Sequence, residues 1–376
     1  MKELYNPFPV YNVAEGNYFC SREPDQDKIL SALRNGRNVT LMSERRMGKT
    51  GLIINLFERL RKDKKAPVCL YVDIFSTKTL NDFVQALARQ VLGRFDSTID
   101  KALASLGNFF KSSRVYVSSD PLTGETQLGL DFQTKEAKHT LLEIFDYLRS
   151  TKKECYLAID EFQQIATYSD SGVEAMLREQ MQFTKNVHFI FSGSKQHLMN
   201  EIFTSPSRPF YKSTDKVQLY AIPKDRYRTF ALKFFKKAKR TFSEDLFNEL
   251  YDYFEGHTWY MQYMLNRLWE SGKEEIQHDD IQQALIDILV AENDNYRNIY
   301  DNLTENQCLL LRAIASEGIA EKVNSSEFMK RYSLVGTSSV NRALHYLLDK
   351  ELVVKLPNGY RVNDRFLALW LRRLFY

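Results

Sequence analysis

The segment from Asn38 to Lys62 constrains the fold of this 376-residue chain more than any other part of its sequence. An apolar, β-rich run (NVTLM) leads into the loop SERRMGKT, and apolar residues then recur at helical spacing. A strand, a loop and a helix with a Gly-Lys-Thr triplet at the junction are the arrangement of a phosphate-binding loop. In such loops backbone N–H groups surround the phosphates of a nucleotide, the lysine contacts the β- and γ-phosphates, and the hydroxyl binds Mg²⁺.

The residues predicted to surround the nucleotide are consecutive in the sequence. They are Ser43, Glu44, Arg45, Arg46, Met47, Gly48, Lys49, Thr50 and Gly51. Lys49 is also predicted to act in catalysis, and Thr50 to bind Mg²⁺. Ser43 stands where the motif expects its first glycine, which leaves the geometry of that turn open. The sequence lacks the Asn-Lys-x-Asp motif that reads guanine, so we expect ATP rather than GTP.

An acidic pair follows a second apolar strand, in the sequence YLAIDE that ends at Glu161. Ligands of open α/β sheets bind at the carboxyl ends of the strands. Asp160 is therefore predicted to hold Mg²⁺, and Glu161 to orient and deprotonate an attacking water. Taken alone, an acidic pair after a strand often caps a helix. Its combination with the Gly-Lys-Thr triplet favours the catalytic interpretation.

Two further positions are candidates for the same site. The next predicted strand ends at Ser192-Gly193-Ser194, where either serine could sense the γ-phosphate or simply end a strand. Arg208 follows in a loop and is a candidate arginine finger, which would stabilise charge in the transition state. The alternative for Arg208 is an ordinary solvated loop arginine.

The chain is too long for one ordinary core, and its pattern changes along its length. In residues 1–222 strands alternate with helices, which predicts a parallel sheet covered on both faces. Within this part, residues 95–135 read as a β-hairpin insertion whose turn is Asp120–Gly124. The α/β pattern is expected to stop after the strand that ends near Phe191.

Two smaller domains are predicted to follow. Residues 223–302 read as a helical lid, with Ser243 as the N-cap of one helix. Residues 303–376 read as three helices and a hairpin, the pattern of a winged helix-turn-helix. Its two strands are joined through Pro357-Asn358-Gly359, whose Asn-Gly favours a tight hairpin turn. The predicted fold class is thus α/β: a P-loop NTPase parallel sheet with a helical lid and a C-terminal winged helix-turn-helix domain.

Five segments resemble motifs of a known family. They are FCSRE at Phe19–Glu23, SERRMGKT at Ser43–Thr50, IDEF at Ile159–Phe162, FSGS at Phe191–Ser194 and EGHTWY at Glu255–Tyr260. With them the chain resembles the prokaryotic AAA-type ATPases of the STAND class, the archaeal-type ATPase family, with a C-terminal winged helix. The resemblance implies a regulatory ATPase that uses ATP and Mg²⁺ and acts on an unidentified protein partner.

Charge and hydropathy limit the other partners. The net charge is only +4, so no strong overall field requires a nucleic acid. The predicted helix Ser338–Lys350 stands where a winged helix would read DNA, and a protein-binding winged helix is the alternative. No apolar run is long enough to span a membrane and no leader is visible, so we expect a cytoplasmic protein without a membrane partner.

Two functions from different classes follow from these features. The first is an ATP-hydrolysing regulatory switch that couples nucleotide state to the winged helix. The second is a DNA-binding regulator in which ATP is a structural or slowly exchanging ligand. The acidic pair Asp160–Glu161 favours the first, because a protein that only binds ATP needs no catalytic carboxylate. A small-molecule kinase is less favoured, since no acceptor-binding signature is visible.

Overall fold

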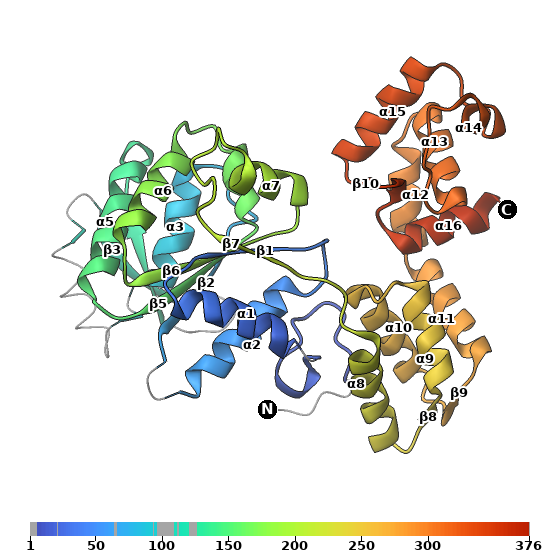
Figure 1. The fold of residues 1–376 in the computed structure, drawn as a ribbon, viewed down its shortest axis with the longest axis horizontal. Helices are drawn as coiled ribbons and strands as arrows, with labels where there is room; N and C mark the ends of the chain where they lie inside the picture. Colours follow the sequence, from blue (N-terminus) through green and yellow to red (C-terminus); the bar gives the residue numbers. More distant parts are fainter. Residues whose placement is uncertain are drawn as a thin grey trace. The chain divides into compact units, whose positions relative to one another are not determined.

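The computed structural model describes residues 6–20, 22–63, 66–92, 94–95, 109–110, 113–119 and 126–375. The chain divides into two compact units (Figure 1). The first unit comprises Met1–Lys233 and Glu255–Tyr263, and the second comprises Phe234–Phe254 and Met264–Tyr376. The predicted domain limits at residues 222 and 302 remain predictions.

A five-stranded parallel sheet forms the centre of the first unit. Its strands are β1 (Val39–Met42), β2 (Val68–Asp73), β5 (Cys155–Asp160), β6 (Val187–Gly193) and β7 (Asp215–Gln218), in the order β2-β5-β6-β1-β7. Every pairing between them is parallel, which confirms the predicted parallel sheet. The expectation that the α/β pattern stops after β6 is wrong, because α7 (Gln196–Thr204) and β7 follow. The sequence pattern does not predict β7, because Val217 is the single buried residue of this strand.

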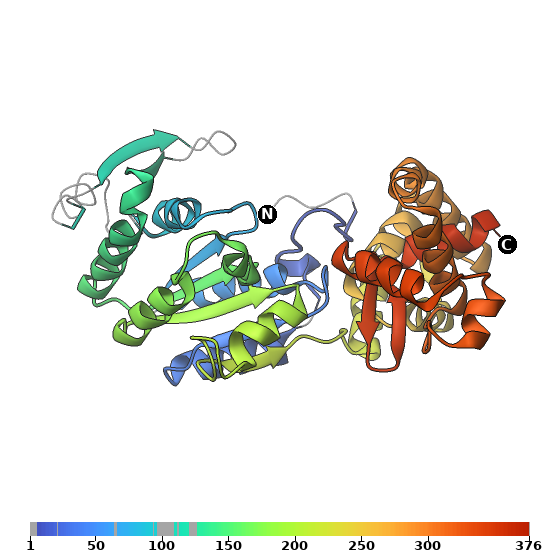
Figure 2. The ribbon, with the colours of Figure 1, turned by 90° about the horizontal axis from the view of Figure 1, so that it is seen from above.

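Helices cover both faces of this sheet. Side chains alternate between the two faces of a strand. Leu157 and Ile159 of β5 therefore join the core under α3 (Leu80–Val91) and α5 (Ala137–Ser150). Tyr156 and Ala158 join the opposite core, under α1 (Glu23–Arg34) and α2 (Lys49–Arg61). Figure 2 shows the sheet nearly edge-on between these two helical layers.

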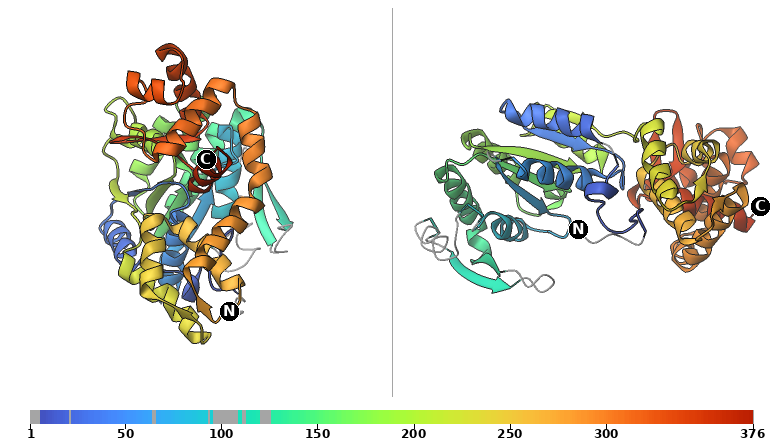
Figure 3. Two further views of the ribbon diagram at one scale, coloured as in Figure 1. Left: turned by 90° about the vertical axis from the view of Figure 1, so that its right-hand side faces the viewer. Right: turned by 90° about the horizontal axis from the view of Figure 1, so that it is seen from below.

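The predicted β-hairpin insertion is confirmed in its strands. Strand β3 (Arg114–Ser119) pairs antiparallel with β4 (Thr126–Asp131). The hairpin lies beside α3 and α5 (Figure 3), and Leu128 and Leu130 are buried in the core that these helices share. The predicted turn, residues 120–124, lies outside the described residues. Helix α6 (Val173–Phe183) completes this layer.

The second unit begins with helices and one short strand pair. Its first elements are β8 (Thr241–Phe242), α9 (Glu244–Tyr253), β9 (Glu275–Ile276), α11 (His278–Ala291) and α12 (Asn293–Asp301). Ser243 caps α9 as predicted, its hydroxyl accepting from the N–H of Leu246 at 3.2 Å. Helices α11 and α12 meet at Glu292, which lies between them. Helices α8 (Lys224–Lys237) and α10 (Thr258–Glu270) begin in the first unit and end in the second.

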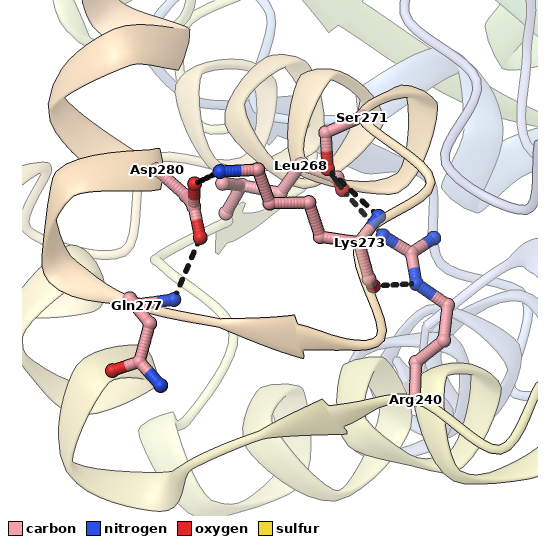
Figure 4. Close-up of polar contacts among 6 residues, drawn as sticks. All are labelled: Arg240, Leu268, Ser271, Lys273, Gln277 and Asp280. Carbon is pink, nitrogen blue, oxygen red and sulfur yellow. Dashed lines mark hydrogen bonds and ion pairs between the residues drawn. The ribbon is translucent and has the colours of Figure 1, made fainter.

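Polar contacts fix the end of α10 (Figure 4). Arg240 donates to the carbonyls of Leu268, Trp269 and Lys273 at 2.9, 2.8 and 2.6 Å. The last carbonyls of a helix lack partners within the helix, and a basic side chain satisfies them well. Lys273 also forms an ion pair with the buried Asp280, which accepts the N–H of Gln277 at 2.9 Å.

The Lys273–Asp280 pair should make stability depend on pH. The pKa of Asp280 is held below its usual range, first by the hydrogen bond from Lys273 and then by that from the Gln277 N–H. A carboxyl with a depressed pKa stabilises the fold above its unfolded pKa, and this stabilisation is lost as pH falls through the folded value. We expect Asp280→Asn to lower the free energy of unfolding by about 1 kcal/mol near neutral pH. The difference in stability between the variant and the wild type should shrink below about pH 4. Urea unfolding of both proteins near neutral pH and below about pH 4 would measure it. An equal loss of stability at both pH values would contradict a role for the Asp280 charge.

The winged helix-turn-helix predicted at the C-terminus is confirmed. Its elements are α13 (Glu305–Glu317), α14 (Ser326–Arg331), α15 (Thr337–Asp349), β10 (Val353–Leu356), β11 (Gly359–Val362) and α16 (Arg365–Phe375). Strands β10 and β11 form an antiparallel hairpin. A capping box opens α13, in which the Thr304 N–H donates to Gln307 Oε1 at 2.9 Å. None of the helices in the described part of the chain has the length and hydropathy needed to cross a bilayer.

The predicted hairpin, joined by a tight turn within Pro357-Asn358-Gly359, is confirmed, but Asn-Gly does not occupy the two turn positions. Gly359 lies opposite Leu356 in the ladder, so the two turn residues are Pro357 and Asn358. The glycine is required for a different reason: a Cβ at this position would lie 2.6 Å from the carbonyl oxygen of Ala320. Ala320 exchanges two backbone hydrogen bonds with Tyr360, at 2.8 and 2.9 Å.

Candidate nucleotide-binding site

The loop between β1 and α2 has the shape of an anion-binding turn. Gly48 has φ = 93° and Arg46 has φ = 62°, so the chain passes through left-handed conformations before α2 begins at Lys49. The free N–H groups at the start of a helix, together with its dipole, attract phosphate. Gly48 is therefore required by its backbone conformation.

The structure shows how Ser43 fits the turn where the motif expects its first glycine. Its φ is not positive, so this turn does not require glycine. The side chain is buried, donates to the carbonyl of Glu44 at 2.8 Å, and accepts from Lys49 Nζ at 3.1 Å. The ammonium also contacts the Glu44 carbonyl at 3.1 Å. Burial lowers the pKa of Lys49, while the charges of Glu161 and Asp160 act in the opposite direction.

Thr50 and Asp160 meet as the sequence predicts for a Mg²⁺ site. The Thr50 hydroxyl donates to Asp160 Oδ2 at 2.7 Å. Both groups offer hard oxygen ligands, the type that Mg²⁺ prefers, so these residues fit the ion. Sequence reasoning missed Tyr71 of β2, whose hydroxyl donates to the same carboxylate oxygen at 2.7 Å. Burial raises the pKa of Tyr71, and the charge of Asp160 adds to the effect.

A third carboxylate, also missed, lies at the same edge of the sheet. Asp73 is the last residue of β2 and pairs in register with Asp160. Asp73 is exposed at its surface, and its pKa is raised, first by partial desolvation and then by the charges of Asp160 and Glu161. A hydrogen bond from the Phe75 N–H at 2.8 Å acts in the opposite direction. Negative charge therefore accumulates where a bound divalent cation would relieve it.

Glu161 is held in an unusual backbone conformation. It has φ = 56°, a left-handed value that costs a non-glycine residue about 1–2 kcal/mol. Its Oε2 accepts from the Ser194 hydroxyl at 2.8 Å and from the side-chain amide of Gln163. Next to it, Phe162 is fully buried, with its ring centroid 4.3 Å from that of Phe191, and it anchors this turn to the core. Other non-glycine residues in the described part of the chain share this conformation, so the contacts of the carboxylate, rather than the backbone alone, mark Glu161 as a site residue.

The two candidate serines differ in their surroundings. Ser194 is half-buried and contacts Glu161, whereas Ser192 is fully buried and its hydroxyl makes no hydrogen bond. Arg208 makes none of the contacts that join the site residues. Its guanidinium lies 3.3 Å from both Glu174 of α6 and Glu201 of α7. The roles of these three residues in sensing and catalysis stay predictions.

Arg22 joins the phosphate loop to other parts of the first unit. Its buried guanidinium donates to the carbonyls of Met47 and Tyr220 at 3.1 and 2.6 Å, and to the Thr258 hydroxyl at 3.3 Å. The motif FCSRE pointed to this arginine as part of a family pattern, but not to its partners. Those partners are far away in the sequence, and only folding brings them together.

Residues at the start of α10 contact the phosphate loop directly. The Thr258 hydroxyl donates to the Met47 carbonyl at 3.2 Å, and His257 Nε2 lies 3.2 Å from the Arg45 carbonyl. The guanidinium of Arg46 stacks on the Trp259 ring, 4.2 Å from its centroid. These contacts lie within the first unit, which includes residues 255–263.

The segment before α1 is fastened to the phosphate-loop helix by one buried side chain. The Asn55 amide donates to the carbonyls of Ala14 and Gly51, both at 2.8 Å, and accepts the Gly16 N–H at 3.0 Å. A Cβ on Gly51 would lie 3.5 Å from the Phe19 ring. That distance is an ordinary van der Waals contact, so the packing of this segment on α2 does not by itself require a glycine after Thr50.

A phosphate loop at the start of a helix and a strand-end Asp–Glu pair on a covered parallel sheet together define a P-loop ATPase. Residues 19–264 match the family described as an ATPase domain predominantly from Archaea, and the chain belongs to that family. Residues 294–373 match the family described as "Probable winged helix domain". No curated protein matches the chain.

Solved structures share this fold over nearly their whole length. A Walker-type ATPase of Pyrococcus abyssi superposes with a TM-score of 0.67 at 17% identity, over 97% of this chain and 99% of that one. The Aeropyrum pernix ORC2 protein, in its ADPNP–ADP complexes, gives 0.55 at 15% identity, over 98% and 96%. The Aeropyrum pernix ORC1 protein in complex with DNA gives 0.52 at 13% identity, over 95% and 94%. At these identities the likeness concerns the fold alone.

Proposed function

We propose that this protein is an ATP-hydrolysing regulatory switch that couples its nucleotide state to the winged helix, as in the STAND class. The observation that carries this proposal is the Glu161 carboxylate, which Ser194 and Gln163 hold in place. Glu161 follows Asp160, the partner of Thr50, in the sequence. A protein that only binds ATP has no need to keep a carboxylate in this position. The ADPNP–ADP complexes of the structurally similar ORC2 protein support the choice of an adenine nucleotide.

Each site residue then has a role. Lys49 contacts the β- and γ-phosphates, and the backbone of residues 43–51 surrounds them. Thr50 and Asp160 hold Mg²⁺, which neutralises phosphate charge when bound. Glu161 orients the attacking water and takes its proton. Ser192 or Ser194 senses the γ-phosphate, and Arg208 serves as the arginine finger once it leaves Glu174 and Glu201.

The start of α10 supplies the coupling in this proposal. Thr258 binds the Met47 carbonyl and Trp259 stacks on Arg46, so a rearrangement of the phosphate loop changes the contacts of this helix. A ligand shifts a conformational equilibrium only by its differential affinity for the two states. ATP and ADP differ at the γ-phosphate, the group that this loop would sense.

We further propose a protein partner and a cytoplasmic location.

Thermal unfolding with nucleotide tests the ligand assignment. Binding to the native protein at 100 times Kd adds about 2.7 kcal/mol to the free energy of unfolding. We expect ATP with Mg²⁺ to raise the melting temperature and GTP to raise it much less. An equal shift with GTP would contradict the choice of adenine, and no shift with either nucleotide would contradict the site.

A DNA-binding regulator is the second candidate. Its support is α15, where Val340, Leu344 and Leu347 are buried while Asn341 and Arg342 are exposed. The ORC1 protein, whose fold is similar, has been solved with DNA.

Salt dependence tests this candidate. If the winged helix binds duplex DNA, the logarithm of the affinity should fall with the logarithm of salt concentration, with a slope near −0.9 for each phosphate contacted. Arg342→Ala should reduce this slope by about 1. Absence of binding at low salt would favour a protein-docking role for the winged helix.

A further inference from the structure

Two donors converge on one oxygen of the Glu161 carboxylate. Gln163 lies two residues further on, in the 3₁₀ helix η3 (Phe162–Thr167), and its side-chain nitrogen donates to Oε2. The Ser194 hydroxyl, from the end of β6, donates to the same oxygen at 2.8 Å. Because both donors contact Oε2, the other carboxylate oxygen of Glu161, Oε1, is the one left to accept a proton from water.

The orientation of the Gln163 amide follows from its partner. An amide oxygen turned toward the carboxylate would repel it, so the nitrogen must face Glu161. The side chain is only 4% exposed, and its own oxygen is buried without a hydrogen bond. Leaving such an acceptor unsatisfied costs about 1–3 kcal/mol. A methionine of similar size would avoid this cost, so packing alone does not explain a glutamine here.

The neighbouring strand leaves room for this side chain. Gly193 separates the two serines at the end of β6, and a Cβ on it would lie 2.4 Å from Gln163 Oε1. The same Cβ would lie 2.5 Å from Met199 Sδ, so a larger residue at this position would displace one or both of these side chains. The glycine therefore allows Gln163 to reach across to Glu161.

We propose that Gln163, with Ser194, is a positioning residue for hydrolysis: it fixes the Glu161 carboxylate so that Oε1 faces the attacking water. This inference rests on the proposed ATPase function. In the hydrolysis step the water proton passes to Glu161, the water oxygen bonds to the γ-phosphorus, and the bond to the leaving ADP oxygen breaks. Gln163 takes no proton itself. It keeps the acceptor in place, and small displacements of reacting groups are costly to rate.

The first test compares two adjacent glutamines. Gln163→Met removes the donor at nearly constant size. Gln164→Met makes the same change at a side chain that instead donates to the Thr77 carbonyl at 3.0 Å. We expect Gln163→Met to slow single-turnover ATP hydrolysis by about 10–100-fold with unchanged ATP affinity and no loss of thermal stability. Gln164→Met should hydrolyse at the wild-type rate.

The second test is a pH profile, which a merely structural role would not move. Gln163→Glu places a second carboxylate against Glu161, and two carboxylates that share a site take up a proton at higher pH than one alone. We expect the pH of half-maximal hydrolysis to rise in this variant.

Four outcomes decide the proposal. A wild-type rate in Gln163→Met, or an unmoved pH profile in Gln163→Glu, would overturn the inference while leaving the ATPase in place. A rate loss that merely follows unfolding of both glutamine variants would overturn it as well. No hydrolysis by the wild-type protein would reject the proposed function itself, and the inference with it.

Discussion

Glu161→Gln is expected to bind ATP as tightly as the wild-type protein and to hydrolyse it about 10²–10⁴-fold more slowly. The substitution keeps the size of the side chain and removes the group that takes the proton from water. In phosphoryl transfer the protein mainly positions groups and stabilises charge, so loss of this acceptor should leave ground-state binding intact. The variant should therefore trap ATP, and equilibrium binding with single-turnover hydrolysis would measure both effects.

A matched control lies at the other end of the same strand. Glu154 precedes β5 and accepts from the Tyr156 hydroxyl at 3.0 Å. Glu154→Gln makes the same chemical change away from the carboxyl edge of the sheet, so its rate should equal that of the wild type. If Glu161→Gln also hydrolyses at the wild-type rate, a different group accepts the proton; Asp73 is then the first carboxylate to examine.

Lys49→Ala is expected to lose most of the ATP affinity, about 10²–10³-fold, because a buried charge that pairs with phosphate disappears. Its effect on stability without nucleotide should be small. Burial disfavours the charged form of Lys49, as its lowered pKa shows, so the ammonium destabilises the nucleotide-free fold by its desolvation. Its contacts with Ser43 and the Glu44 carbonyl partly offset that cost.

Isothermal titration with ATP and thermal unfolding without it would measure the two effects separately. Lys62→Ala, at the exposed end of α2, removes the same charge outside the loop and serves as the control. Weak binding by both variants would indicate a general charge effect. A large loss of melting temperature in Lys49→Ala alone would show that the lysine stabilises the loop itself.

The sequence allowed the main parts of the site to be predicted because they are contiguous. A strand, a turn and a helix start place Lys49 and Thr50 without reference to the rest of the chain. The contact of Thr50 with Asp160 could also be expected, because parallel strands bring their carboxyl ends to one edge. The sequence alone left open how Ser43 replaces the expected glycine. In the structure the Ser43 hydroxyl accepts a hydrogen bond from Lys49 Nζ.

Contacts between distant segments could not be predicted in this way. Tyr71 is one of several aromatic residues in a strand, and nothing local shows that its hydroxyl reaches Asp160. Gln163 sits in a short 3₁₀ turn without periodicity, and Arg22 has partners some 25 to 236 residues away. Strand β7 was missed because a four-residue strand carries too little pattern to be recognised.

The stacking of Arg46 on Trp259 gives the protein a built-in optical probe. The chain has three tryptophans, and the other two belong to the second unit, where Trp269 packs on Phe235 and Trp370 donates to Asn293. Indole emission depends on the charge and polarity next to the ring, and here that neighbour is a guanidinium of the phosphate loop itself. Trp259 thus places a fluorophore one side chain away from where the nucleotide phosphates would lie, without any label.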